Sequence, residues 1–382
     1  MQAQGQTKAI IIGGGIGGIT VAIALRRVGV DVTVYERAPE LQEVGSAIPL
    51  WTNAFKALQQ LGLGEKVVKL GEPVNTVSLT TWRGSVLADL TNEKHLQQLG
   101  TVSTVVHRAE LLAMLVETLG MENVRLGANC TGFTQDESGV LAHFADGTEA
   151  RGDFLVGADG IHSTIRSQLF GIIKPPYVGY TCWRGVAHIA RTGLETYAWG
   201  KGYQFGITPM TRGRAYWFAQ KYAPEGDHDK AVGRKQEVLN LFHDWHDPIP
   251  AVIEATNEAE ILRNDVYELQ HLKRWSIGRV TLLGDAAHAM TPNLGQGGCL
   301  AIEDAVALAA CVAAERGIVA ALKLYEKRRI RRTRTIGTLA HLIGQVVQIE
   351  NNVVAGTRNA IMKRVPASFV VKRVLWILDY EV

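Results

Sequence analysis

A glycine-rich turn close to the N-terminus constrains the fold more than any other segment of this sequence. The turn, Gly13–Gly18, has the spacing G-x-G-x-x-G and follows the buried-strand pattern Lys8–Ile12. An apolar helical stretch, Ile19–Val28, comes next, and a second strand pattern covers Asp31–Glu36. Strand, helix and strand within about 30 residues form a right-handed βαβ unit. The chain is therefore predicted to begin with a parallel sheet.

The same turn predicts a dinucleotide site. Gly13 permits the tight turn, Gly15 lets a diphosphate approach the backbone, and Gly18 allows the helix and strand to pack closely. Backbone N–H groups at the helix N-terminus then meet the phosphates. Glu36, about 20 residues further on, is expected to accept hydrogen bonds from an adenosine ribose, and we include its neighbour Arg37 in the same site. The turn alone does not distinguish FAD from NAD.

Composition excludes several classes of protein. With 382 residues, the chain is long enough for one large domain or two interleaved domains. A net charge of only +3 argues against nucleic acid as a main partner. The four cysteines contain no C-x-x-C pair, which argues against a zinc site and against a disulfide framework, and we predict no metal. We see no signal peptide and no apolar run of about 20 residues, so we expect a cytoplasmic protein.

The residue composition and the strand pattern of the sequence change in the middle of the chain. Strand patterns of the first type return at Phe154–Gly160 and Arg279–Asp285, whereas residues 176–222 are rich in Tyr, Trp, Phe, Thr and Gly, as in antiparallel sheets. We predict an α/β fold: a Rossmann-type domain with a parallel sheet, interrupted by a β-rich substrate domain and followed by C-terminal helices. The predicted boundaries are 1–72, 99–175 and 270–335 for the Rossmann-type domain, 73–98 and 176–269 for the β-rich domain, and 336–382 for the helical segment.

Three predictions concern the C-terminal part. The basic run Tyr325–Arg334 is expected to be a solvated helix face rather than a nucleic-acid patch. The amphipathic segment Phe369–Leu378 is expected to pack onto the first domain or onto a second subunit, with contact to a membrane surface as the alternative. A stripe at helical spacing is predicted to form one packed helix face: Leu339, Leu342, Ile343, Val346 and Val347.

Two further motifs carry a family resemblance. Ala158-Asp-Gly-Ile-His-Ser-Thr-Ile-Arg166 and Leu283-Gly-Asp-Ala-Ala-His288, which continues to Gly298, closely resemble the DG and GD signatures of the single-component FAD-dependent aromatic monooxygenases. These enzymes share the p-hydroxybenzoate hydroxylase fold. The resemblance covers residues 8–335, and Gly179–Gly185 is similar to the branch of urate hydroxylase, salicylate hydroxylase and zeaxanthin epoxidase.

The resemblance implies an activity. FAD would be the cofactor, NADH or NADPH the co-substrate, and dioxygen the oxidant. A small aromatic, heteroaromatic or polyene substrate would be hydroxylated or epoxidised through a flavin hydroperoxide. The loop Trp199–Gly206 lacks the arginine that urate-specific relatives use, which puts urate in doubt. A reductase or oxidase of the same fold and a non-catalytic nucleotide-binding protein are the alternatives, and the oligomeric state stays open.

Asp285 and the loop after it are expected to hold the flavin. Asp285 follows a buried strand, so its carboxylate can bond a ribityl hydroxyl, and an N-cap aspartate is the alternative. The loop contains Pro292, Gly295 and Gly298 and leads into a helix. It is expected to place N–H groups and a positive helix end at the pyrimidine edge of the flavin, unless it is only a tight turn.

Three more residues enter the predicted site through the resemblance. Asp159 matches an aspartate that supports FAD and the visiting nicotinamide nucleotide, or it only braces the turn. Arg108 matches an arginine near the flavin, or it is a surface residue at a helix start. Cys130 lies on a predicted strand, Asn123–Gly132, whose backbone contacts the adenine in relatives, while the thiol itself only packs.

The predicted substrate residues are Tyr216 and Arg184. The period of two in Ala215–Gln220 places Tyr216 and Phe218 on one face and Trp217 on the other. The resemblance turns Tyr216 toward the flavin, where its hydroxyl would orient a substrate or shift a phenol toward phenolate; a core aromatic is the alternative. Arg184 lies in an apolar strand and would bind an anionic substrate or form a structural ion pair.

Overall fold

The glycine turn joins the first two strands of a six-stranded sheet. The computed structural model describes residues 6–41, 47–73, 77–89, 104–189, 195–229 and 231–382. Strand β1 (Lys8–Ile12) pairs in parallel with β2 (Asp31–Tyr35) and β12 (Phe154–Gly157), and α1 (Ile16–Arg27) connects β1 to β2. The order is β18-β19-β12-β1-β2-β8, with β18 (Ser276–Ile277), β19 (Val280–Leu282) and β8 (Val124–Arg125). The predicted α/β class with a parallel Rossmann-type sheet is confirmed.

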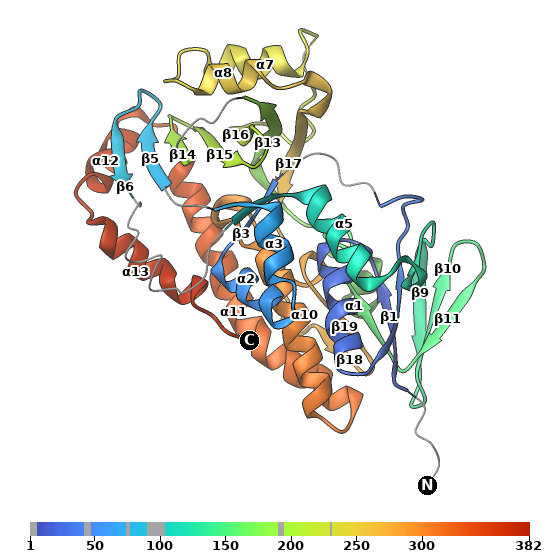
Figure 1. Ribbon diagram of the computed structural model, residues 1–382. Coiled ribbons are helices and arrows are strands. Elements are labelled where there is room, and N and C mark those ends of the chain that lie inside the picture. Colours follow the sequence, from blue (N-terminus) through green and yellow to red (C-terminus); the bar gives the residue numbers. More distant parts are fainter. Residues whose placement is uncertain (1–5, 42–46, 74–76, 90–103, 190–194, 230) are drawn as a thin grey trace.

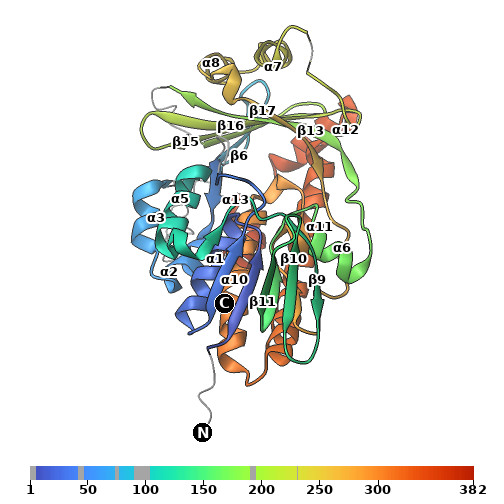
Figure 2. The ribbon, with the colours of Figure 1, turned by 90° about the vertical axis from the view of Figure 1, so that its right-hand side faces the viewer.

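The central strands of this sheet are apolar because both of its sides are covered. Residues 9–12 of β1 and all of β12 are buried. In Figure 2, helices that include α1 and α10 lie on one side of the six-stranded sheet, and a smaller antiparallel sheet lies on the other side. The covering elements are α5 (Arg108–Leu119), α10 (Gly297–Ala314), β9 (Cys130–Gln135), β10 (Val140–Phe144) and β11 (Glu149–Gly152).

A second, seven-stranded sheet lies across the first domain, as Figures 1 and 2 show. Helices α7 (Arg234–Phe242) and α8 (Ile249–Glu254) cover its outer side, where Trp183, Phe205 and Trp217 are fully buried against them. We call the opposite side, which faces the first domain, the inner side. The strand order is β17 (Leu262–Tyr267), β13 (Tyr177–His188), β16 (Arg214–Tyr222), β15 (Tyr203–Met210), β14 (Glu195–Trp199), β5 (Val77–Thr81) and β6 (Val86–Asp89).

A small three-stranded sheet joins the two large ones. Its strands are β3 (Ala47–Leu50), β7 (Thr104–His107) and β4 (Glu72–Pro73), with α2 (Thr52–Gln60) and α3 (Gly64–Leu70) beside them. Ala47 and Val105 pack against Val186 and Met210 of the seven-stranded sheet. Close by, an ion pair of 3.0 Å joins Glu110 of α5 to Arg214 of β16. The start of α5 is therefore fixed against the inner side.

The predicted strand Asn123–Gly132 is wrong. Residues Met121–Asn123 form a 3-10 turn, η1, and only Val124–Arg125 pair with β2 as β8. The chain turns through Gly127, whose φ is +70°, before it enters β9 at Cys130. The break follows from sheet geometry, because β8 belongs to the parallel sheet and β9 to the antiparallel one.

The long C-terminal helix corrects a second prediction. Helix α11 (Ile318–Val347) buries Ile336, Ala340 and Val347, but Leu342 is 50% exposed and Val346 is 43% exposed. The packed face thus includes small residues such as Ala340, which the predicted stripe of large apolar side chains does not contain. The remaining elements are α6 (Thr164–Phe170), η2 (Glu258–Glu260), α9 (Asp285–His288), η3 (Pro292–Leu294), α12 (Asn352–Met362) and α13 (Ala367–Leu378).

The proposed division into domains stays a prediction. The seven-stranded sheet takes its strands from 77–89 and 177–267. The boundary at 98/99 lies outside the described residues, and the boundary at 335/336 falls inside α11. Within the described part of the chain, α10 has the length and apolar composition of a membrane span, but 67% of that window is buried, as expected for a core helix.

Candidate cofactor and substrate site

The glycine turn has the geometry that a diphosphate requires. Gly13 has a φ of +109°, and a Cβ there would overlap the carbonyl of Ala158, the residue that follows β12. A Cβ on Gly18 would overlap the carbonyl of Gly13. By contrast, a Cβ on Gly15, at the N-cap of α1, would meet no atom within 4 Å. The turn is closed where it packs on the protein and open where the helix N-terminus points outward.

Glu36 lies beside this turn. Its carboxylate accepts hydrogen bonds from the backbone N–H of Gly14 at 2.6 Å and of Ala38 at 2.9 Å. These bonds hold both carboxylate oxygens at the end of β2, and each oxygen keeps a lone pair for a ligand hydroxyl. The next residue, Arg37, is exposed and makes no hydrogen bond or ion pair with the residues that the structure describes.

Asp285 is an exposed carboxylate between two helix starts. It is the first residue of α9, but Gly284 is the N-cap and no side chain caps the helix. Among the described residues it has no hydrogen-bond or ion-pair partner, and its Oδ1 lies close to Gly297, where α10 begins. The alternative of an N-cap aspartate therefore does not describe this residue.

The loop from Pro292 to Gly298 packs against β3. Gly295 is left-handed, with a φ of +61°, and a Cβ on Gly298 would overlap the side chain of Ile48. Asn293 donates a hydrogen bond of 2.9 Å to the hydroxyl of Tyr180 in β13. The indole N–H of Trp51, close to Gly295, is buried and has no acceptor among the described residues. The loop thus connects the start of α10 to the seven-stranded sheet.

The carboxylate of Asp159 is occupied by the start of the helix that follows it. It accepts hydrogen bonds from the hydroxyl of Ser163, the N-cap of α6, at 2.6 Å and from the Thr164 backbone N–H at 2.8 Å. Burial nevertheless raises the pKa of Asp159. The geometry is that of the bracing alternative, so a contact with a nicotinamide nucleotide stays a prediction.

Cys130 lies near Asp159. Its thiol donates to the carbonyl of Gly132 at 3.4 Å, and burial, with a smaller contribution from the Asp159 charge, raises its pKa. The other three cysteines are also buried and free. No group of three or more His, Cys, Asp or Glu in the described part of the chain is placed to hold a metal.

The inner side of the seven-stranded sheet presents aromatic and polar side chains in register. Residues two apart on each strand share this side, and the pairing of β13, β16, β15 and β14 aligns them. Trp217 lies on the outer side, so the predicted alternation is confirmed. Three rows result: Glu195, Thr208, Tyr216 and Val186; Tyr197, Gly206, Phe218 and Arg184; and Trp199, Gln204, Gln220 and Cys182.

Four of these side chains keep part of their surface exposed: Tyr197, Phe218, Arg184 and Tyr216. Their neighbours Glu195, Thr208, Gln204 and Gln220 are buried. The exposed four therefore form a connected patch in the middle of the inner side, which we call the inner patch.

Arg184 and Tyr216 are brought together with Arg108. Burial raises the pKa of Tyr216, and the charges of Arg184 and Arg108 act against that rise. Arg184 donates a hydrogen bond of 2.5 Å to the Asn264 amide oxygen, its Nε has no partner, and no carboxylate among the described residues pairs with it. The structural ion pair that was the alternative for Arg184 is not found in the described structure.

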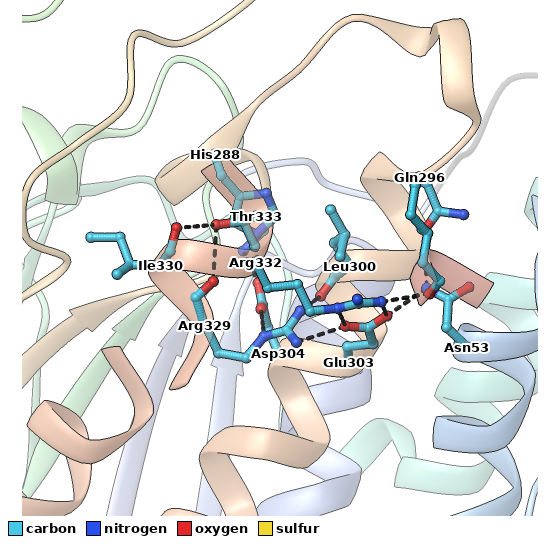
Figure 3. A network of polar contacts seen from close by, with 12 residues as sticks. Asn53, His288, Gln296, Leu300, Glu303, Asp304, Arg329, Ile330, Arg332 and Thr333 are labelled. Atoms are coloured by element: carbon cyan, nitrogen blue, oxygen red, sulfur yellow. Dashed lines mark hydrogen bonds and ion pairs between the residues drawn. The ribbon is translucent and has the colours of Figure 1, made fainter. Parts of the chain in front are cut away.

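A buried ion network supports this site, and the sequence reading missed it (Figure 3). Glu303 and Asp304 lie in the middle of α10 and are fully buried. Arg329 of α11 binds both carboxylates, at 2.6 Å each, and Arg332 binds Glu303 at 2.8 Å with two nitrogens. His288 of α9 contacts Asp304 at 2.6 Å. The network connects the short helix that carries Asp285 to α10 and α11.

The prediction of a solvated basic face on Tyr325–Arg334 is thus wrong in part. Tyr325, Arg329 and Arg332 are buried, while Lys327, Arg328 and Arg331 are exposed. The overlooked signal was the Glu303-Asp304 pair inside an otherwise apolar helix, because two buried carboxylates require cations nearby.

Arg332 also reaches the C-terminal helix. It donates to the backbone carbonyl of Ile377 at 2.7 Å, and its guanidinium lies 3.8 Å from the ring centre of Tyr380. An ion pair of 2.7 Å joins Lys56 of α2 to Asp379. The predicted packing of the last segment onto the first domain agrees with these contacts.

Comparisons with known proteins agree with this geometry. A family model described as an FAD binding domain matches residues 6–339. The aurachin C monooxygenase/isomerase of Stigmatella aurantiaca is 40% identical over 357 residues, which cover 93% of either chain. An FAD-dependent urate hydroxylase of Klebsiella pneumoniae is 34% identical over 335 residues, which cover 86% of this chain and 87% of that protein.

A solved structure has the same fold throughout. Klebsiella pneumoniae HpxO, in complex with FAD and uric acid, superposes with a TM-score of 0.92 at 30% identity and covers 98% of this chain and 97% of its own. The open glycine turn, the exposed Asp285 carboxylate and the orphaned Trp51 N–H are what an extended FAD would require. The chain therefore belongs to the FAD binding domain family and is an FAD-dependent monooxygenase.

Proposed function

We propose that this monooxygenase hydroxylates or epoxidises a small aromatic, heteroaromatic or polyene molecule held against the inner patch. The observation that carries the proposal is the patch itself: two phenols, a phenyl ring and a guanidinium remain partly exposed on the side of the sheet that faces the flavin domain. Flat rings stack on such a surface, and the single cation favours a substrate with an anionic or electron-rich substituent.

The predicted cofactor residues define a path for FAD along the first domain. The diphosphate would lie at Gly13, Gly15 and Gly18, over the N-terminus of α1, and Glu36 would accept hydrogen bonds from the adenosine ribose. Asp285 would bond the ribityl chain, and the ring would lie at the loop from Pro292 to Gly298. When bound, FAD accepts electrons from NADH or NADPH and activates dioxygen for transfer of one oxygen atom.

The protein supplies position and electrostatics. The N-terminus of α10, an 18-residue helix, would stabilise negative charge at the flavin ring. Tyr216 stays protonated at neutral pH, because burial raises its pKa, so its hydroxyl would donate to a substrate oxygen. Arg184, with Nε free, would pair with an anionic substituent.

A substrate panel tests this function. Holoenzyme would be reduced anaerobically by NADH or NADPH in the presence of salicylate, 2,6-dihydroxypyridine, uric acid or zeaxanthin, which are the compounds named for related enzymes. We expect an aromatic compound with an acidic substituent to accelerate reduction most. Uric acid should be a weak accelerator, because the segment 199–206, which joins β14 to β15, offers the buried Gln204 and no arginine.

Labelled dioxygen then separates oxygen transfer from oxidase chemistry. We expect one ¹⁸O atom per product molecule from ¹⁸O₂. Hydrogen peroxide as the sole oxygen product with every accelerating compound would contradict the proposed function. A cytoplasmic location also stays a prediction, which fractionation of cells would check.

A further inference from the structure

The last two helices, α12 and α13, carry exposed apolar side chains that the function described so far does not use. Fourteen large apolar side chains are exposed among the described residues, and five of them lie on these two short helices. They are Val353, Val354, Ile361, Phe369 and Trp376. Figure 1 shows α12 and α13 one after the other along one edge of the molecule. We call these five residues, with the exposed cations Lys363 and Arg364 between the helices, the C-terminal face.

The opposite side of α12 is fixed to the protein. Ala355 and Arg358, three residues apart and thus on one side of the helix, are both buried. The Arg358 guanidinium donates to the backbone carbonyl of Val347, at the end of α11, at 2.9 Å, and to that of Gly200, between β14 and β15, at 3.0 Å. It also lies 5.1 Å from the ring centre of Trp199. These contacts set the rotation of α12, so its exposed apolar side chains are held toward the solvent.

Helix α13 is also held on one side only. Ile377 is 2% exposed and packs with Leu300 and Ile336. Phe369 and Trp376 are about two helical turns apart and therefore share a side of α13, where they are 53% and 43% exposed. Exposed apolar side chains that gather in one patch mark a surface that meets an apolar partner.

The charge of this region favours one kind of partner. Residues 351–378 contain five Lys or Arg and no Asp or Glu, although the whole chain has nearly equal numbers, 40 basic and 37 acidic. Of the five cations, Arg358 is buried, whereas Lys363 and Arg364 are exposed. Apolar side chains next to cations suit the surface of an anionic bilayer, because the acyl chains accept the apolar groups and the lipid phosphates accept the cations.

A second copy of the chain fits this surface less well. In a two-fold symmetric pair, the same face of both chains would meet. Lys363 and Arg364 of one chain would then lie near those of the other, and residues 351–378 offer no carboxylate to pair with them. An anionic lipid surface supplies the missing negative charge.

We propose that the C-terminal face docks this enzyme on the surface of a membrane that contains anionic phospholipids. The exposed sides of α12 and α13 enter the boundary between the headgroups and the acyl chains, and Lys363 and Arg364 pair with lipid phosphates. The contact is peripheral, because the buried sides of both helices stay packed on the protein. Docking does not depend on which substrate is oxidised, so it goes beyond the proposed function.

Vesicle flotation of the holoenzyme tests docking without any substrate. The vesicles would consist of phosphatidylcholine alone or of phosphatidylcholine with about 30% phosphatidylglycerol. We expect the enzyme to float with the anionic vesicles and to stay largely unbound with the neutral ones. An increase in salt from about 0.1 M to about 0.5 M should lower the partition coefficient between vesicles and water by about 10-fold, because ions screen the exposed cations.

A matched pair of isoleucine variants tests the apolar contribution. Ile361→Ser should lower the partition coefficient by about 10-fold, because one apolar side chain no longer enters the interface. Ile172→Ser is the control, since Ile172 is 93% exposed but lies in the segment after α6. It should leave vesicle binding unchanged. Flavin absorbance and melting temperature should be the same in both variants as in the wild type.

A matched pair of charge variants tests the cations. Lys363→Gln combined with Arg364→Gln should lower partitioning onto anionic vesicles by about 10-fold or more, with little change on neutral ones. Lys327→Gln combined with Arg328→Gln removes the same charge from exposed positions in the first half of α11. This control should bind anionic vesicles as the wild type does.

The possible results distinguish docking from its alternatives. No flotation with anionic vesicles, or equal losses in the test and control variants, would overturn the proposal. A dimer in sedimentation velocity that Ile361→Ser converts to a monomer, without vesicle binding, would assign the face to a second copy and would also overturn it. Vesicle binding as expected, with no compound of the substrate panel accelerating flavin reduction, would support docking while the proposed substrate class fails.

Discussion

The two ends of the site are built by different means. At the glycine turn, backbone atoms form the site, and the side chains matter mainly by being absent, as the packing of Gly13 and Gly18 shows. On the inner patch, side chains such as Tyr216 and Arg184 form the site, and the backbone only spaces them. The glycine turn therefore tolerates almost no substitution, whereas the inner patch can be changed residue by residue without loss of the fold.

The largest effect is expected from a substitution at the glycine turn, the end of the site that backbone atoms form. Gly18→Ala places a methyl group on the Gly13 carbonyl, so we expect about 4 kcal/mol or more of lost stability and a protein without flavin. Thermal unfolding and the ratio of flavin to protein absorbance would measure both. Gly15→Ala is the control, because its methyl group meets no protein atom: the fold should survive while FAD affinity falls. Normal flavin content in Gly18→Ala would show that the glycine turn does not require the absence of a side chain at this position.

The buried ion network that joins α9, α10 and α11 gives the next largest effect. Burial alone would raise the pKa of Asp304, but His288 and Arg329 outweigh it and hold that pKa below its ordinary value. Asp304→Asn leaves Arg329 short of a buried partner, so we expect a loss of about 3–5 kcal/mol at pH 7 in urea unfolding.

The same variant carries a pH test. A lowered carboxyl pKa contributes stability above its ordinary value of about 3.9, and this contribution disappears as the pH falls through the lower, folded-state value. The difference between wild type and Asp304→Asn should therefore shrink in acid. An equal difference at pH 7 and at about pH 3 would show that the charge on Asp304 does not stabilise the fold.

A substitution on the inner patch is expected to affect the reaction but not the fold. Arg184→Met removes the cation beside Tyr216 but no ion pair of the described structure, so flavin content and melting temperature should change little. Substrate-dependent flavin reduction should fall by about 10- to 100-fold, mainly through KM for an anionic compound. Arg234→Met, at a surface ion pair on the outer side, should leave the reaction unchanged. An unchanged KM in Arg184→Met would remove the arginine from substrate binding.

The smallest effect is expected from Leu342→Gln on α11, which lies outside the glycine turn and the inner patch. Leu342→Gln should change stability by no more than about 0.5 kcal/mol, because this leucine is half exposed on α11. Ile336→Ala, on the buried face of the same helix, should cost about 2–5 kcal/mol. Urea unfolding of the two variants would measure both changes in stability. A larger loss in Leu342→Gln than in Ile336→Ala would support the helix face predicted from the sequence.

The sequence predicted the backbone-built end of the site better than the rest. The strand, turn and helix around Gly13 follow from local spacing, and so does the alternation that separates Tyr216 from Trp217. The sequence did not indicate which residues of different elements meet. Nothing local shows that Glu303 faces Arg332, that Asn293 reaches Tyr180, or that Glu195 lies in one row with Tyr216, because these contacts depend on packing between distant segments.

Local patterns also fail where packing decides between equal candidates. In α11, Leu342 and Ile336 are both apolar, and only the position of the helix on its neighbours determines which one is buried. The Asn123–Gly132 segment was predicted as one strand, but its two halves belong to two different sheets and the chain turns at Gly127 between them. In both cases the tertiary structure overrides the pattern.

The ion network at the middle of α10 restricts how this enzyme can move. The first turn of α10 follows the loop Pro292–Gly298, which is expected to hold the flavin ring. Two buried carboxylates in the same helix form ion pairs with α11, and Arg332 links them to the end of the chain. A piston-like or tilting displacement of α10 would strand those charges in a dry interior. Any opening that admits cofactor or substrate must therefore come from movement of loops or of the flavin ring, while α10 keeps its position.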